Sequence, residues 1–141
     1  MTPKQVELVQ TSFAKVVPIA DVAAEIFYNR LFEIDPSLRS MFRSDMKQQG
    51  KKLMDSLKMV VGNLRNLDRI VPGVQAMAVR HVSYGVKDDH YAIVGTALLD
   101  TLQAGLGDAF TEEVREAWFK AYTILADTMK AAAAKAEGRA A

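Results

Sequence analysis

The apolar residues of this chain return every three or four positions, and no convincing stretch alternates apolar with polar residues as a strand would. The clearest stripe lies within residues 45–66 and consists of Gln49, Leu53, Leu57, Val60 and Leu64. A polar residue therefore heads an otherwise apolar stripe. Because a period of about 3.6 residues keeps side chains on one face of an α-helix, the sequence predicts an all-α fold.

Helix start and stop signals divide the first part of the chain. Thr2, Pro3 and Gln5 form the pattern of an N-cap, a first-turn proline and a capping-box partner. The helix that follows has an expected apolar face of Val6, Val9, Phe13, Val16 and Val17. Pro18 interrupts this helix, and the Asp35-Pro36 pair ends a second one before a short corner.

Similar signals divide the second half of the chain. A short helix follows a Pro-Gly pair, carries His81 on its inward face, and stops at Gly85. Asp88 is the expected N-cap of the next helix, and Thr111 is that of the last one. The whole pattern predicts six to seven helices.

The length of the chain suits one packed domain. With 141 residues, half of them hydrophobic, it can bury one core but not comfortably two. We expect a single domain over residues 1–141. Residues 131–141 contain no apolar side chain larger than that of alanine, so we expect this tail to fray.

Charge and composition exclude several classes of function. The 18 basic and 17 acidic side chains nearly cancel, so no basic field favours nucleic acid. No apolar run reaches the roughly 20 residues that cross a bilayer, and the first residues lack a signal peptide's apolar stretch. We expect a soluble, cytoplasmic protein with no membrane insertion. Because the chain has no cysteine, any metal must be held by histidine, carboxylate or tyrosine.

The chain contains two histidines, of which only His81 is expected to face inward. One interpretation of His81 is a neutral core histidine bonded to a backbone carbonyl, which periodicity alone favours. The other is a ligand to haem iron, for which imidazole is a common choice. His90 competes for that role, but it follows two aspartates at a helix start, where a histidine more often caps or pairs with acids.

Five segments occur in an order that resembles a known family over roughly residues 2–130. They are IFYNRLF, DPSLRSMF, QGKKL, VRHVSYGV and HYAIVGTALL. In these features the chain resembles bacterial single-domain globins, and it is similar to the haem domain of flavohaemoglobins and to Vitreoscilla-type haemoglobins. The resemblance implies a globin fold packed around a buried haem b, iron protoporphyrin IX.

The resemblance also implies a role for each matching residue. On the proximal side, His81 would be the ligand of the haem iron, Tyr91 would lie behind it, and Arg80 would be a candidate partner of a haem propionate. On the distal side, the matching residues are Tyr28 and Gln49 as a polar pair, Leu53 as the apolar residue nearest the sixth coordination position, and Phe42 stacked on the porphyrin.

The function implied is reversible binding of dioxygen, for storage or delivery, with nitric oxide and carbon monoxide as further ligands. Tyr28 and Gln49 can both donate hydrogen bonds, which stabilise the partial negative charge of a bound dioxygen. One alternative is a nitric oxide dioxygenase that works with a separate reductase. Another is a haem-free globin fold used as an interaction or sensor module. A monomer and a homodimer both remain open.

Two departures from the family pattern restrict this expectation. Flavohaemoglobins continue into flavin- and nicotinamide-binding domains, so we expect any electrons to come from a separate reductase. The family's last-helix glutamate, aligned from Trp118, corresponds to Ala133, and Glu137 lies roughly 6 Å further along a helix. We therefore expect weaker support of His81 as an electron donor, which favours ligand binding over strong oxidative chemistry.

Overall fold

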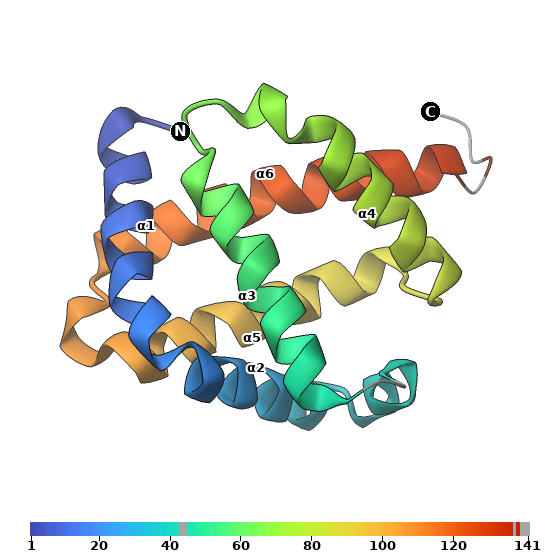
Figure 1. Cartoon of the computed structure of the whole chain (residues 1–141), viewed down its shortest axis with the longest axis horizontal. Coiled ribbons are helices and arrows are strands. Elements are labelled where there is room, and N and C mark those ends of the chain that lie inside the picture. The colour runs from blue at the N-terminus through green and yellow to red at the C-terminus, as the bar shows by residue number, and fades with distance from the viewer. Residues whose placement is uncertain (43–44, 137, 139–141) are drawn as a thin grey trace.

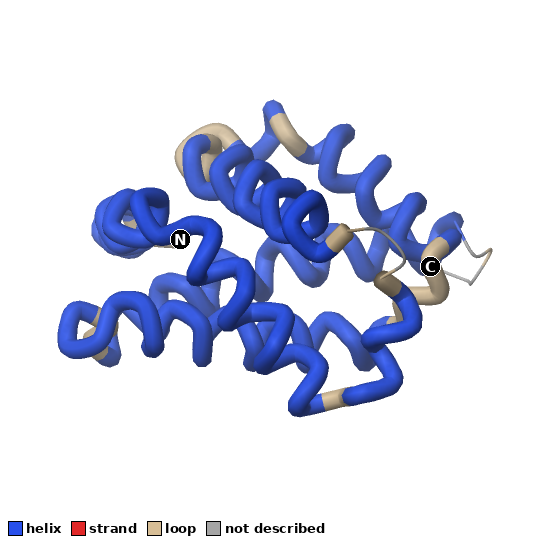
Figure 2. Tube along the Cα trace, turned by 60° about the horizontal axis from the view of Figure 1, so that its bottom comes forward, coloured by secondary structure: helices blue, strands red, loops and turns tan. Residues whose placement is uncertain are grey.

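The computed structural model describes residues 1–42, 45–136 and 138. The α-helices among them are α1 (Pro3–Val16), α2 (Ala20–Ile34), α3 (Met46–Gly62), α4 (Val71–Ser83), α5 (Asp88–Leu106) and α6 (Glu112–Ala136). Short 3-10 segments occupy Val17–Ile19, Pro36–Met41, Leu67–Arg69 and Gly107–Ala109. Figure 2 shows a trace that is helical almost throughout, with no strand in the described residues. The all-α prediction is confirmed.

The helices cross one another in pairs rather than forming a parallel bundle. In Figure 1, α3 runs across the front of the molecule, while α5 and α6 pass behind it. The most extensive packing joins α4 to α6, α2 to α5 and α1 to α6. Helices α3 and α4 are adjacent in the chain and diverge from their connection. The start of α3 and the end of α4 therefore lie far apart.

Two apolar clusters hold these crossings together. The larger one joins α1, α2, α5 and the first half of α6, and its most deeply buried large side chains include Val9 and Leu31. Trp118 belongs to it, and its indole Nε1 donates a 2.8 Å hydrogen bond to the buried hydroxyl of Ser12. The smaller cluster lies between α4, α5 and the second half of α6. Burial of this apolar surface is the main contribution to the stability of the fold.

The predicted signals at the start of α1 are confirmed. The Thr2 hydroxyl accepts from the Gln5 amide at 3.1 Å, and the Gln5 side chain accepts from the Thr2 amide at 2.9 Å. Both arms of the capping box are therefore present. Pro18 lies in the 3-10 segment that separates α1 from α2, and α2 ends one residue before Asp35, as expected.

Several boundaries differ from the sequence prediction for local reasons. Helix α3 ends at Gly62, because the side chain of Asn63 donates to the Met59 carbonyl at 2.7 Å and closes the helix before residue 66. Asp88 is the first residue of α5, whereas Lys87 is its N-cap. Val17 lies in a 3-10 turn and is 38% exposed rather than part of the core.

The C-terminal tail also differs from the expectation that residues 131–141 fray. Helix α6 continues through Ala136, and Ala133 is only 3% exposed. Small side chains suffice here because α4 packs closely along this half of α6. Residues 137 and 139–141 of that tail lie outside the described residues. No helix within the described ranges combines the length and apolarity needed to cross a membrane.

Candidate functional site

His81 lies in the last turn of α4 and is half-buried. Its Nδ1 atom is 2.7 Å from the carbonyl oxygen of Met77, one turn earlier. Because a carbonyl can only accept, Nδ1 carries the proton, and Nε2 of the neutral ring holds a lone pair. Burial lowers the pKa of His81 against the opposing effect of this hydrogen bond, and the charge of Arg80 lowers it further. The ring is thereby held neutral and oriented by its own helix.

The end of α4 fixes the backbone at His81. Gly85 adopts a φ of +89°, a left-handed conformation that glycine reaches at low cost. The amide of Gly85 donates to the carbonyl of Val82, and the amide of Val86 donates to the carbonyl of His81, each at 3.0 Å. These two bonds form a Schellman motif, which terminates the helix at Ser83, two residues after the histidine. His81 therefore has a defined main-chain position.

Tyr28 and Gln49 are brought together from α2 and α3. The hydroxyl of Tyr28 donates to the backbone carbonyl of Gln49 at 3.2 Å. This distance exceeds the usual range for such a bond, so the interaction is weak. Tyr28 is 8% exposed, and burial raises its pKa to about 12. The side chain is a protonated hydrogen-bond donor throughout the physiological pH range.

Gly50 makes the close approach of α2 and α3 possible. A Cβ atom at this position would lie 2.9 Å from the Cβ of Ala24, closer than real Cβ contacts. The crossing therefore depends on two small residues, Ala24 on α2 and Gly50, which follows Gln49 in the chain. The short distance between the backbones determines where Gln49 lies relative to Tyr28.

An aromatic cluster surrounds Tyr28. The ring of Phe42 lies 5.3 Å from that of Tyr28 in an edge-on arrangement, and the ring of Phe32 lies 5.5 Å from that of Phe42. Phe27 packs on the other side of Tyr28 at 5.0 Å. Edge-on packing of this kind is favourable and restricts rotation of the rings. It fixes the Tyr28 side chain and places the half-buried Phe42 beside it.

The stripe on α3 changes from half-buried to buried along its length. Gln49, Leu53 and Leu57 are half-buried, whereas Val60 is 6% exposed. Near the middle of the helix, the hydroxyl of Ser56 lies 3.9 Å from the sulfur of Met77, whose carbonyl holds His81. The apolar stripe and the histidine thus belong to two helices that diverge from their connection and are bridged by this side-chain contact (Figure 1).

Tyr91 lies in the smaller apolar cluster, together with Val74 and Ala78 of the helix that carries His81. It is 6% exposed. Its carbonyl accepts a 2.6 Å hydrogen bond from the hydroxyl of Tyr122 on α6, whose pKa is raised, mainly by burial. No sequence pattern singles out this role of Tyr122. Gly95 leaves room for the Tyr122 ring, since a Cβ at that position would lie 2.8 Å from it.

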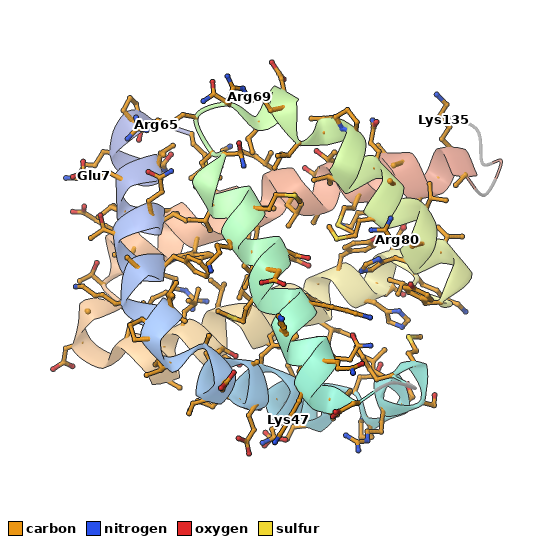
Figure 3. All side chains as sticks on the ribbon, viewed as in Figure 1. Glu7, Lys47, Arg65, Arg69, Arg80 and Lys135 are labelled. Carbon is orange, nitrogen blue, oxygen red and sulfur yellow. The ribbon has the colours of Figure 1, made fainter. Side chains whose placement is uncertain are left out.

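The remaining candidates, Arg80, His90 and Ala133, differ in exposure. Arg80 is exposed on α4 and lies within the outline of the molecule in Figure 3, unlike the peripheral Arg65 and Lys135. His90 accepts a 3.0 Å hydrogen bond at Nδ1 from the amide of Lys87 and thereby closes the first turn of α5. This is the capping role expected for it. Ala133 is buried on α6, and Glu137 lies outside the described residues.

The sequence profile of the globin family matches residues 25–129 of this chain, a range that contains Tyr28, Gln49 and His81. The chain belongs to the globin family. The structure of this globin is similar to that of a bacterial globin from Campylobacter jejuni, with a TM-score of 0.83, 28% identity, and coverage of 98% of this chain and 100% of the other. The all-α fold described above is therefore the globin fold.

Curated relatives of this globin include flavohemoproteins of Oceanobacillus iheyensis and Xylella fastidiosa. The first is 33% identical over 88% of the chain and the second 32% identical over 92%. The globin spans 31% and 33% of the lengths of these two relatives. A second similar structure is an engineered carbene transferase, described as a candidate nitric oxide dioxygenase of Rhodothermus marinus. Its TM-score is 0.89, with 25% identity and coverage of 98% of this chain and 96% of the other.

Proposed function

We propose that this globin binds haem b and that Nε2 of His81 is the proximal ligand of its iron. The observation that carries this proposal is the Nδ1 bond of His81 to the Met77 carbonyl, which leaves the Nε2 lone pair for a metal. No described residue is hydrogen-bonded to Nε2, and the described side chains include no buried nitrogen or oxygen without a partner. Nε2 therefore borders accessible space, as a ligand atom requires.

Half-buried apolar side chains on α3 and in the aromatic cluster fit a large apolar group. Leu53, Leu57 and Phe42 are half-buried in this structure although they belong to an apolar stripe and an aromatic cluster. Burying several hundred Å² of apolar surface on a haem would contribute on the order of 10 kcal/mol. A bound haem supplies a ferrous iron at which small gases coordinate. Arg80, exposed beside His81, is the proposed partner of a propionate.

Tyr28 and Gln49 are the proposed donors to the gas. The 3.2 Å bond from the Tyr28 hydroxyl to the Gln49 backbone is weak, so the hydroxyl can rotate toward a better acceptor at low cost. A hydrogen bond to a partly charged ligand contributes about 1.5 to 3 kcal/mol. Leu53 shares the α3 face of Gln49 and would limit access of water. Dioxygen is the ligand that gains most from such donors, ahead of carbon monoxide.

The function that we infer is reversible binding of dioxygen, for storage or delivery in the cytoplasm. Absorbance spectra of the purified protein in ferric, ferrous and air-equilibrated ferrous forms test it. The expected result is a Soret band in all three forms and a stable oxygenated spectrum that reverts on removal of oxygen. Absence of a Soret band after expression with ample haem would instead support an interaction or sensor module that needs no haem.

Nitric oxide dioxygenation is a second candidate, favoured by the similarity to the Rhodothermus marinus protein and to flavohemoproteins. It requires an electron donor, which we propose to be a separate reductase. The oxygenated protein would be mixed with nitric oxide, NADH and a flavin-dependent reductase, and nitrate would be counted per haem. Sustained turnover favours the dioxygenase, whereas one nitrate per haem followed by a ferric spectrum favours the binding protein.

The residues on the proximal side of the site favour reversible gas binding over nitric oxide dioxygenation. Ala133 occupies the α6 position at which the family resemblance implies a glutamate, and it is buried. Without that carboxylate, His81 relies on the neutral Met77 carbonyl as its hydrogen-bond acceptor. A carbonyl acceptor increases the donor strength of imidazole less than a carboxylate does. We propose that Tyr91 serves here as a packing residue whose backbone is held by Tyr122.

A further inference from the structure

A groove lies between α1, the start of α2 and the outer face of α3. Its volume is about 310 Å³, at the lower end of the range of roughly 300 to 1,000 Å³ typical of small-molecule sites. None of the residues proposed to contact haem lines it. The groove is therefore a separate feature, and by helical periodicity its α3 residues lie on the face opposite to Gln49.

Apolar side chains form the floor of this groove. Phe13 is 5% exposed, and its ring lies 6.1 Å from that of Trp118, so the floor rests on the main core. Met54 contributes from α3, and Val17 contributes from the 3-10 turn, where it is 38% exposed. Such an exposed valine gains free energy when an apolar ligand covers it.

The rim of the groove is charged and basic on balance. Its charged lining residues are Lys47, Lys51, Lys58, Asp21 and Asp55, which give a net charge of +1. None of these five side chains forms an ion pair with another described residue. The acids Asp21 and Asp55 oppose an anionic ligand, so an anion would bind at the most basic part of the rim.

That part is the start of α3, where Lys47 lies at the lower end of the helix in Figure 3. Lys47 and Lys51 are four residues apart on one face, in the first two turns. Like charges at this spacing repel each other. The Asp45 carboxylate already caps the positive end of the helix by accepting from the Lys47 amide at 3.0 Å. An anion between the two ammonium groups would remove the repulsion between them.

We propose that this groove binds a small anionic amphiphile, with its carboxylate between Lys47 and Lys51 and its aliphatic chain along Phe13, Val17 and Met54. The groove is open on one side, and its volume of about 310 Å³ suits a free fatty acid of medium length rather than a segment of a protein. Lysine is well suited to the anion because its ammonium group carries three donors and its stem can cover apolar surface.

Isothermal titration of the purified protein with decanoate and hexanoate, both kept monomeric, tests the proposal. Dithionite keeps any haem iron ferrous, and carbon monoxide saturates the buffer so that the gas position on the iron is filled. The expected result is one site that binds decanoate more tightly, by about fourfold for each further methylene buried. No saturable binding of decanoate, or equal affinity for the two acids, would overturn the proposal.

Matched variants locate the site. The double variant Lys47→Gln/Lys51→Gln should weaken decanoate binding at least about tenfold, and Asp21→Asn should tighten it. Lys52→Gln is the control, because Lys52 is an exposed lysine of the same helix that does not line the groove. Equal losses in Lys52→Gln and the double variant would indicate a general basic surface and contradict the groove.

A second variant and a second probe complete the test. Val17→Asp places a charge on a side chain that is already exposed, so the fold should survive while decanoate binding is lost. Sedimentation with phosphatidylglycerol vesicles distinguishes a membrane surface from a free acid. Binding to vesicles without binding of decanoate would replace the proposed site by a peripheral membrane contact.

Discussion

Tyr28 is the residue on which retention of the gas depends most directly. Its hydroxyl forms one weak hydrogen bond to the backbone carbonyl of Gln49, and its ring is buried among other aromatic rings. Tyr28→Phe should accelerate oxygen dissociation by roughly ten- to a hundredfold, the equivalent of one hydrogen bond to a charged group. Stopped-flow displacement of oxygen by carbon monoxide measures the rate. An unchanged rate would mean that the hydroxyl stays on the Gln49 carbonyl.

Burial of Tyr28 also predicts a dependence of stability on alkaline pH. Its pKa is about 12 in the folded chain and about 10 when unfolded, so the unfolded chain loses the proton first as the pH rises. This residue's contribution is complete below pH 10 and should decline by about 1.4 kcal/mol per pH unit from about pH 10 to 12. Urea unfolding of wild type and Tyr28→Phe across that interval measures the difference. Parallel curves for the two proteins would contradict the shift.

The crossing of α2 and α3 is the element-scale feature that determines the distal side. Gly50→Ala should push the helices apart, because the new Cβ would lie 2.9 Å from that of Ala24, and cost about 1 to 3 kcal/mol. Gly62→Ala is a matched control on the same helix, with no atom within 4 Å of the added Cβ. Urea denaturation should show a loss only in the first variant. Equal stability of both would mean that the crossing is not tight.

Sequence patterns predicted those features of the elements that depend on local geometry. The capping box of Thr2 and Gln5, the stop at Gly85 and the inward direction of His81 all follow from spacing within one helix. Contacts between helices did not follow in the same way. The bond of Tyr122 to the Tyr91 carbonyl joins residues 31 apart, and no periodicity encodes it.

The wrong predictions for Val17 and for the end of α6 also arise from contacts that local sequence does not encode. Val17 fits the apolar period of α1, but the proline that follows it converts the turn to a 3-10 segment and rotates the side chain outward. Ala133 lacks apolar bulk, yet tight packing of α4 on α6 buries it. Tertiary packing determined the outcome in both places. The distal and proximal roles were predicted by family resemblance, and they stay predictions.

On the scale of the whole molecule, haem should contribute to the fold itself. Gln49, Leu53 and Leu57 of the α3 stripe are only half-buried, whereas Val60 and Leu64 further along it are buried. Removal of haem by acid and butanone should therefore lower Tm by on the order of 10 °C or more. Circular dichroism of both forms measures this shift. Identical melting of the two forms would show that haem adds nothing to the packing.

The central claim is that His81 holds the iron, and haem content of a His81→Gly variant tests it most directly. The variant would be purified with and without imidazole, and haem would be counted per chain by the pyridine haemochrome method. We predict one haem per wild-type chain, loss of haem in the variant, and recovery with imidazole, which can occupy the space left by the side chain. Full haem content in the variant without imidazole would contradict the assignment and direct attention to His90.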